Sequence, residues 1–167
     1  FEESHKASVA GAGLAEKLKD PGSLGECIML TGQSWYFKGA YDSAAVYYYK
    51  ALDILTKSND LLKKAGVLNE LGKLYRKTRD LDRSLQMYDD AFSIYKNLDD
   101  ESNMATILNE SGVVFEYRGD YDEAIKRYKA SLEIREKLND DVGKGYSYNF
   151  LGGVYTLQKK FTEAEKY

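Results

Sequence analysis

Side chains that could carry out chemistry are few in this sequence. Its 167 residues include one histidine, His5, and one cysteine, Cys27. A zinc site needs several His or Cys ligands at short spacings, and a nucleophilic cysteine needs a neighbouring base; neither pattern is present. We therefore expect no catalytic residue, no metal site and no cofactor, and we interpret Cys27 as a small buried residue.

Carboxylates are plentiful, but their spacing suits structural roles. Glu123 stands four residues before Arg127, and Glu133 stands four residues before Lys137, so both sets predict ordinary ion pairs on a helix surface. Asp120 precedes a helical pattern and fits a helix cap better than catalysis. The function is therefore expected to reside in a binding surface rather than in a reactive centre.

The sequence repeats with a period of 40 residues, and its clearest markers are Gly32, Gly72, Gly112 and Gly152. A fixed period of this length is typical of a solenoid of stacked supersecondary units. Further residues keep the same register, namely Asn69, Asn109 and Asn149, then Tyr48, Tyr88 and Tyr128, and also Asp60, Asp100 and Asp140.

Each period contains two helical patterns separated by a break. In the third period, apolar and small residues recur at offsets of three and four over 108–115 and again over 121–132. Basic residues, Arg135 and Lys137, follow in the last turn, where they suit the helix dipole. We expect Gly112 to face Ala124 where the two helices cross. Each period is thus predicted to be a helix, a tight turn and a second helix.

The unit L-x-x-S-G-x-x-F followed by G-D-Y-D-E-A-I-x-x-Y-x-x-S-L, within 108–132, resembles the tetratricopeptide repeat (TPR). Its period of 40 residues, against the usual 34, is similar to the long-helix variety of LGN/Partner-of-Inscuteable proteins, kinesin light chains and bacterial Rap-type regulators. The resemblance implies an all-α fold, a right-handed superhelix of antiparallel helix pairs. It also implies that the first helices of successive repeats line a concave groove.

The register divides the chain into repeats and partial repeats. Both ends fall inside a repeat, so we expect the chain to be a segment of a longer protein, or the ordered part of one. Its open ends could also support self-association. We expect a turn at 20–23, followed by a first helix from about Leu24. The predicted divisions are 1–20 as the second helix of a preceding partial repeat, 21–60, 61–100 and 101–140 as three full repeats, and 141–167 as a partial fourth.

Composition limits the class of partner. The net charge is −3 and the basic residues are dispersed, so no nucleic-acid footprint is indicated. No apolar run reaches the length of a membrane span, and no signal peptide opens the sequence. Together with the single cysteine, these features predict a cytoplasmic, intracellular protein with no membrane association.

Three asparagines, Asn69, Asn109 and Asn149, occupy identical places on the predicted inner face. An amide offers both a donor and an acceptor, so a row of amides could hold the main chain of an extended peptide. Resemblance to LGN-type repeats implies the same role for this position. The alternative is that each amide ties neighbouring helices together by internal hydrogen bonds.

A basic cluster, Lys73, Arg76 and Lys77, lies on the same predicted face. An acidic side chain of a partner could pair with this cluster, and Arg76 could grip a carboxylate with two hydrogen bonds. The alternative is a solvated helix end whose charges complement the helix dipole.

Aromatic residues could accept the apolar side chains of a peptide. Tyr36 and Phe37 suggest an apolar sub-pocket in the first repeat, although Phe37 could instead pack in the core. Glu116 and Tyr117 stand on the corresponding stripe of the third repeat.

These residues together predict a protein–protein interaction module that captures a peptide segment of a partner in its groove. Two alternatives remain open at this stage. The chain could be a purely structural solenoid segment of a large assembly, or a regulatory switch that changes its pitch when a peptide binds.

Overall fold

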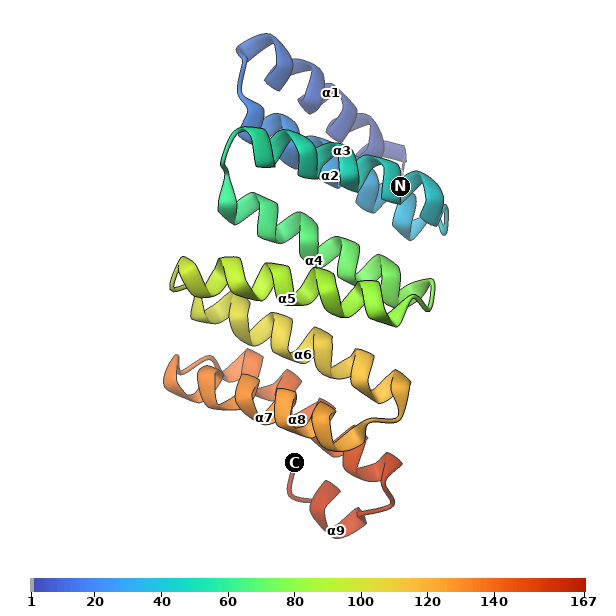
Figure 1. Ribbon diagram of the computed structural model, residues 1–167, viewed down its shortest axis with the longest axis vertical. Helices are drawn as coiled ribbons and strands as arrows, with labels where there is room; N and C mark the ends of the chain where they lie inside the picture. The colour runs from blue at the N-terminus through green and yellow to red at the C-terminus, as the bar shows by residue number, and fades with distance from the viewer. Residues whose placement is uncertain (1) are drawn as a thin grey trace. The chain divides into compact units, whose positions relative to one another are not determined.

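The protein is described from a computed structural model that covers residues 2–167 (Figure 1). Phe1, which the predicted helix 1–20 includes, lies outside the described residues. Within this range every element is an α-helix, so the predicted all-α class is confirmed. The helices are α1 (Glu2–Leu18), α2 (Pro21–Phe37), α3 (Tyr41–Lys57), α4 (Leu61–Lys77), α5 (Leu81–Asn97), α6 (Glu101–Arg118), α7 (Tyr121–Lys137), α8 (Asp141–Leu157) and α9 (Phe161–Ala164).

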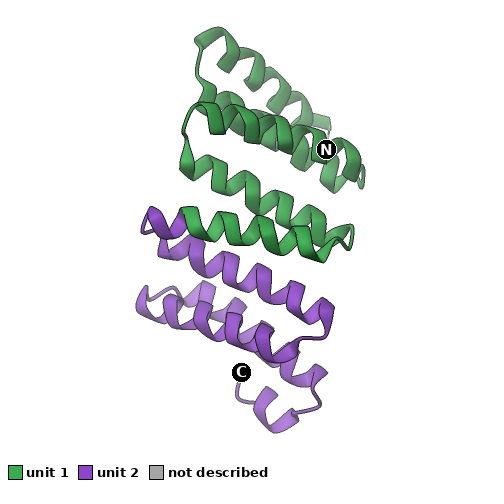
Figure 2. Ribbon diagram, in the orientation of Figure 1, with its two compact units in different colours: residues 1–94 green, residues 95–167 purple. Residues whose placement is uncertain are grey.

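The chain forms two compact units, residues 1–94 and 95–167, and the division falls within α5 (Figure 2). In unit 1, α2 packs against both α1 and α3, and it also touches α4. In unit 2, α7 packs against α6 and α8, and α6 and α8 also contact each other. In unit 1, α2 and α4 therefore meet beside α3, and in unit 2, α6 and α8 meet beside α7. This is how successive helix pairs pack in a repeat.

A recurring aspartate starts the first helix of each pair. Its carboxylate accepts a hydrogen bond from the backbone N–H three residues later and satisfies a donor that a helix N-terminus leaves unpaired. The distances from N to Oδ1 lie between 2.9 and 3.2 Å. The four bonds are Ser23 to Asp20, Lys63 to Asp60, Asn103 to Asp100 and Gly143 to Asp140.

One predicted helix start and one predicted capping role were wrong. Helix α2 begins at Pro21 rather than near Leu24, because Asp20 caps it and proline is well accepted at the first helical position. Asp120 precedes α7 but its side chain makes no capping hydrogen bond, so its predicted capping role is not observed.

A residue with left-handed backbone conformation occurs every 20 residues, after one helix and shortly before the next. Two of these positions are glycines, Gly39 and Gly119, both with φ of 82°. Each of these residues ends a helix and redirects the chain. The others are Lys19, Asn59, Arg79, Asp99, Asn139 and Lys159, with φ between 53° and 68°.

The periodic glycines make room for buried tyrosine rings. A Cβ added at Gly112 would overlap the ring of Tyr128, which is fully buried. The sequence predicted that Gly112 faces Ala124. Ala124 is also fully buried, but the atoms nearest to an added Cβ at Gly112 belong to Tyr128. The same arrangement joins Gly32 to Tyr48 and Gly72 to Tyr88.

Gly152 differs from the other three periodic glycines. An added Cβ there would meet only ordinary contacts with Ala164 and Tyr167, the nearest at 3.7 Å. The close approach of helix and ring is therefore seen in three of the four registers.

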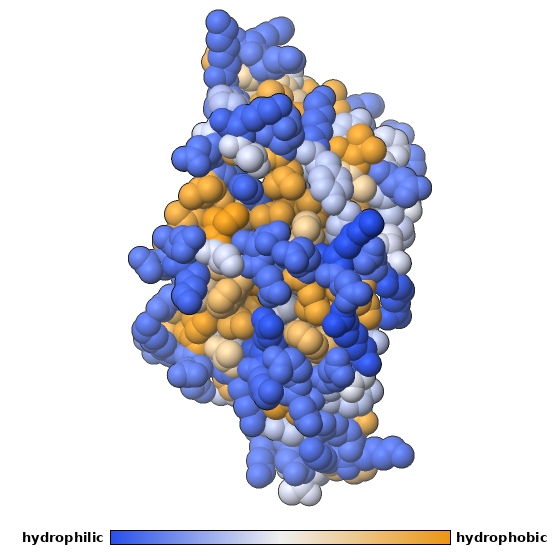
Figure 3. Space-filling model, viewed as in Figure 1, coloured by the Kyte–Doolittle hydropathy of each residue, from blue (hydrophilic) through white to orange (hydrophobic). Residues whose placement is uncertain are grey.

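Each unit has its own apolar core. In unit 1 the core includes Tyr48, Leu55 and Leu71, and in unit 2 it includes Tyr128 and Leu151. On the face drawn in Figure 3, hydrophilic residues lie between the exposed apolar patches.

Candidate functional site

The predicted aromatic residues of unit 1 lie at the C-terminal end of α2. Tyr36 is half-buried, and its ring centroid lies 5.7 Å from that of Phe37 and 5.6 Å from that of Tyr41. Phe37 is 81% exposed, so the alternative that placed it in the core is wrong. An exposed ring braced by a half-buried one can accept an apolar side chain from a partner.

The predicted basic cluster of Lys73, Arg76 and Lys77 lies beside the carboxylate of Glu70. Lys73 Nζ lies 2.8 Å from Glu70 Oε1 within α4, whereas Lys77 is exposed. Burial raises the pKa of Tyr36, and the nearby positive charge of Arg76 opposes that rise. Tyr36, Glu70, Lys73 and Arg76 are therefore close enough to interact electrostatically in unit 1.

The three matching asparagines have different surroundings. Asn109 is 7% exposed, and its Nδ2 donates to Ser147 Oγ of α8 at 3.2 Å, as the internal-tie alternative expected. Asn69 is half-buried and Asn149 is exposed. The carbonyl oxygens of Asn69 and Asn109 are both buried and accept no hydrogen bond from the described residues. The role of these amides toward a peptide stays a prediction.

Glu116 and Tyr117 lie near the end of α6 in unit 2. The hydroxyl of Tyr128 donates to Glu116 Oε1 at 2.7 Å, which holds this carboxylate in place. Tyr117 is 49% exposed. Neither residue lines the pocket of unit 2.

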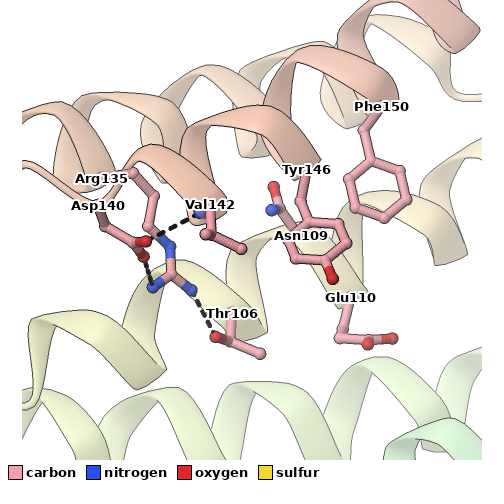
Figure 4. Close-up of a pocket in the computed structure, with 9 residues that line it drawn as sticks. Thr106, Asn109, Glu110, Arg135, Asp140, Val142, Tyr146 and Phe150 are labelled. Carbon is pink, nitrogen blue, oxygen red and sulfur yellow. Dashed lines mark hydrogen bonds and ion pairs between the residues drawn. The ribbon is translucent and has the colours of Figure 1, made fainter.

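A pocket of about 380 Å³ lies in unit 2 where α6 and α8 meet (Figure 4). This volume falls within the range of small-ligand sites. Tyr146 and Phe150 project from α8, and Asn109 and Glu110 belong to α6. The pocket is lined by Thr106, Asn109, Glu110, Arg135, Asp140, Val142, Gly143, Tyr146 and Phe150.

Arg135 forms a buried link at one side of the pocket. It reaches from α7 and is only 8% exposed. Its Nη1 donates to Asp140 Oδ2 at 2.7 Å and to Ser102 Oγ at 3.1 Å, and its Nη2 donates to Thr106 Oγ1 at 2.6 Å. One guanidinium thus connects α6, α7 and the capping residue of α8.

Arg135 lies in the last turn of α7, as the sequence predicted, but its burial was not predicted, and neither was most of the pocket. Its register could have revealed this, because the residues 40 and 80 positions earlier are Tyr95 and Leu55, both buried. Of the residues lining the pocket, only Asn109 was a predicted site residue.

Local hydrogen bonding keeps the Asp140 carboxylate ionised. The backbone N–H of Gly143 and the charge of Arg135 hold the pKa of Asp140 below its usual value of 3.8. Gly143 itself has no room for a side chain, because an added Cβ would overlap Asp140 Oδ2 and lie 2.5 Å from Arg135 Cδ.

The described residues were also informative about metal sites and membrane spans, because neither is found among them. No group of three His, Cys, Asp or Glu residues there could hold a metal ion. Within residues 2–167, none of the helices combines the length and the apolar character that crossing a membrane requires. Cys27 is half-buried rather than fully buried.

Solved structures with the same fold include several repeat proteins. BtubC (BKLC) from P. vanneervenii is 25% identical, with a TM-score of 0.86 over 99% of this chain and 69% of that one. The TPR-like repeats of a putative kinesin light chain from Podosopora anserina are 13% identical, with a TM-score of 0.77 over 99% and 82% of the two chains. The apo form of RapI is 16% identical, with a TM-score of 0.81 over 96% and 45%.

Family comparison agrees with these likenesses. No curated protein matches the sequence. Two family models, both described as tetratricopeptide repeat, match residues 65–98 and 103–167, which together make up more than half of the chain. The predicted resemblance is confirmed, and the chain belongs to the tetratricopeptide-repeat family.

Proposed function

We propose that this chain is a protein-interaction module that binds an extended peptide segment of a partner on the face of its first helices. Tetratricopeptide repeats support a protein-binding role, and no catalytic step is proposed for the chain itself. Its single cysteine suits a reducing compartment, so we place the interaction in the cytoplasm.

One observation carries this proposal. Asn69 and Asn109 stand in the same register of two repeats, and the side-chain oxygen of each is buried without a donor among the described residues. A buried acceptor without a partner is costly, and most are satisfied in native proteins. The N–H groups of an extended peptide would satisfy both oxygens, and Asn149 would supply a third amide in the same register.

Neighbouring side chains give the peptide a direction and a composition. In unit 1, Lys73, Arg76 and Lys77 would attract acidic side chains, and Tyr36 with Phe37 would contact apolar ones. In unit 2, Glu116 and Tyr117 would contact the peptide beyond the Asn109 pocket.

The experiment is a selection of linear peptides from a display library against the intact chain, followed by calorimetry with the peptides obtained. An Asn69→Ala/Asn109→Ala double variant is expected to bind at least about tenfold more weakly, because it removes two hydrogen bonds to the main chain. Circular dichroism checks that the variant is folded. The matched control is Gln86→Ala, which removes an exposed amide from the second helix α5.

Unchanged affinity in the double variant would reject the role of the amides. If the selection yields no peptide that binds the intact chain in calorimetry, the peptide-binding function as a whole is rejected.

A structural role is the second candidate, and one observation favours it. On α1 the apolar side chains of Val9, Leu14 and Leu18 are 51%, 58% and 70% exposed. Leu14 and Leu18 stand about one turn apart on α1, and exposed apolar side chains so placed suit contact with another repeat or another copy of the chain. Sedimentation of the wild type and of a Leu14→Glu/Leu18→Glu variant tests it; a monomer at high concentration in both would remove self-association from consideration.

A further inference from the structure

We propose that the pocket between α6 and α8 receives one neutral aromatic side chain of the bound peptide. This inference rests on the proposed function and adds the chemistry of one ligand side chain to it. It concerns unit 2 alone, and it depends on the apolar wall that α8 contributes to the pocket.

The first argument is a change of residue type at three register positions of the first helices. The positions follow one another at intervals of four residues, so they share one side of a helix. Only α8 has a large apolar residue at all three positions, and this apolar stripe is therefore a feature of α8 rather than of the repeat. The residues at these positions are Gly22, Glu26 and Leu30 in α2, Leu62, Gly66 and Glu70 in α4, Ser102, Thr106 and Glu110 in α6, and Val142, Tyr146 and Phe150 in α8.

The second argument is that much of this apolar stripe is exposed to water. Val142 is 72% exposed and Tyr146 is 63% exposed, and both line the pocket. Phe150 is half-buried and is fixed by stacking on Tyr128, with ring centroids 5.0 Å apart and planes within 10°. A ligand side chain that covers Val142 and Tyr146 would remove apolar surface from water, which favours binding.

The third argument is that the charged groups of the pocket are already engaged within the protein. Arg135 is paired with Asp140 at 2.7 Å, and its Nη2 donates to Thr106 Oγ1 at 2.6 Å. Glu110 also interacts with another group of the protein. A charged ligand group would therefore lose its water in the pocket without gaining a free counter-charge. A neutral side chain is favoured instead.

The fourth argument favours an aromatic side chain over an aliphatic one. Two rings, those of Tyr146 and Phe150, project from α8 among the residues that line the pocket (Figure 4). Rings that meet edge to face or offset gain free energy beyond that of the area they bury, as the pair of Phe150 with Tyr128 illustrates. The volume of about 380 Å³ lies near the lower end of ligand sites, which suits one side chain rather than a longer segment.

The direct experiment is an NMR titration of the intact chain with N-acetyl-phenylalanine amide, compared with the leucine, lysine and glutamate compounds of the same form. We expect saturable shifts at the methyl groups of Val142 and at the ring of Tyr146 with the phenylalanine compound. The leucine compound should bind about fivefold more weakly, because it lacks the contact between rings, and the two charged compounds more weakly still. A leucine or charged compound that binds as tightly as the phenylalanine compound, or saturable binding of none of them, would overturn the proposal.

A matched pair of double variants locates the ligand. Val142→Ser/Tyr146→Thr gives α8 the residues that α6 has at two of the three positions, and it should bind the phenylalanine compound at least about fivefold more weakly. The control, Val46→Ser/Phe161→Thr, changes a valine and a ring that are 67% and 60% exposed and do not line the pocket, and it should leave binding unchanged. Circular dichroism checks that both variants are folded. Equal losses in the two variants would overturn the proposal, because the compound would then bind exposed apolar surface in general.

A peptide selected as described above separates this inference from the proposed function. If the exchange of one aromatic residue of the peptide for leucine lowers affinity about fivefold in the wild type but not in Val142→Ser/Tyr146→Thr, the pocket assignment holds. If the peptide binds but tolerates that exchange at every aromatic residue, or contains no aromatic residue, the inference is overturned while the peptide-binding function stands.

Discussion

The start of α4 in unit 1 and the start of α8 in unit 2 are built on equivalent aspartates that have different cations. In unit 1, Lys63 Nζ lies 3.6 Å from Asp60 and 3.4 Å from Glu26, and the lysine side chain is 35% exposed. In unit 2, the corresponding carboxylate of Asp140 is paired with Arg135, whose side chain is 10% exposed.

Three substitutions in the repeat register accompany this exchange. Leu55, Lys63 and Glu26 of unit 1 correspond to Arg135, Gly143 and Thr106 of unit 2. Leu55 packs over Gly25 in the core of unit 1, at the place where unit 2 buries a guanidinium. The positive charge has moved from the first turn of the following helix to the interior, and Gly143 leaves the space that Arg135 fills.

Both repeats keep the hydrogen bond from a backbone N–H to the capping aspartate, but the cation beside that aspartate is Lys63 in unit 1 and Arg135 in unit 2. The capping distances are 3.2 Å at Asp60 and 2.9 Å at Asp140. In unit 2 the cation, Arg135, is buried, and Gly143 stands where unit 1 has Lys63. The carboxylate of Asp140 therefore lies at the edge of a pocket. A structural change in the repeat thus creates a site that could take a ligand.

The largest effect is expected from Arg135→Leu, which places the unit 1 residue in unit 2. It should lower the free energy of unfolding of unit 2 by about 2–4 kcal/mol, because the hydroxyls of Ser102 and Thr106 and the carboxylate of Asp140 lose a buried partner. The matched change in unit 1, Lys63→Met, should cost no more than about 1 kcal/mol, because this pair is partly solvated.

Native-state hydrogen exchange of α6–α8 measures the first change, and fluorescence of Trp35, the only tryptophan, measures the second in urea. The variant Arg135→Leu/Gly143→Lys/Thr106→Glu carries the complete unit 1 arrangement and should recover most of the loss. Equal losses for Arg135→Leu and Lys63→Met would show that the two junctions are energetically the same.

A smaller loss is expected from Gly143→Ala, at about 1–3 kcal/mol, because the new methyl group would displace Arg135 and Asp140. Two residues later, Gly145→Ala meets no atom within 4 Å and should stabilise α8 by up to about 1 kcal/mol through helix propensity. Both are measured by urea unfolding followed by circular dichroism. Similar effects of the same sign would mean that the packing of Arg135 over α8 is unimportant.

Asn109→Ala should cost about 1–2 kcal/mol, because it leaves the buried hydroxyl of Ser147 without this donor. Asn149→Ala, in the same register but exposed, should stay within about 0.5 kcal/mol. The two variants compared without ligand show how much Asn109 contributes to stability, apart from any contribution to binding. It is measured by thermal unfolding without ligand, and an equally large loss in Asn149→Ala would contradict it.

The smallest effect is a dependence on pH. Because the pKa of Asp140 is lowered in the folded chain, its contribution to stability is present above the unfolded value near 3.8 and is lost as the pH falls through the folded value. Hydrogen exchange of α8 below about pH 4 should therefore show less acid sensitivity in Arg135→Leu than in the wild type. The same slope in both proteins would mean that Arg135 does not tune this carboxylate.

The helical architecture could be predicted from the sequence because each repeat carries the same two helical patterns. The 40-residue register identified the recurring glycines, tyrosines and aspartates, whereas the contact of each tyrosine with a glycine and the capping role of the aspartates came from the structure. The ion pair of Glu123 with Arg127 was confirmed at 3.6 Å. Lys137, by contrast, pairs with Glu101 of α6 rather than within α7 as expected, because a partner on another helix cannot be inferred from spacing along one helix.

The candidate site was less predictable than the fold, because its features come from differences between repeats. Arg135 reads as a normal basic residue of a last turn, and only its alignment with Leu55 and Tyr95 indicates burial. Asn69, Asn109 and Asn149 are identical in register, yet they range from half-buried to buried to exposed. Their surroundings depend on residues contributed by a different helix, which a periodic pattern does not specify.

The left-handed residues at 20-residue intervals have a consequence for engineering. Because each one ends a helix with the same backbone geometry, junctions such as Asn59–Asp60 and Asn139–Asp140 are interchangeable connection points. Deletion or duplication between these two junctions would remove or add two complete helix pairs, α4 with α5 and α6 with α7, without altering the phase of their neighbours. An insertion of one or two residues inside a helix would instead rotate every later side chain about the helix axis and misplace the glycine opposite its tyrosine.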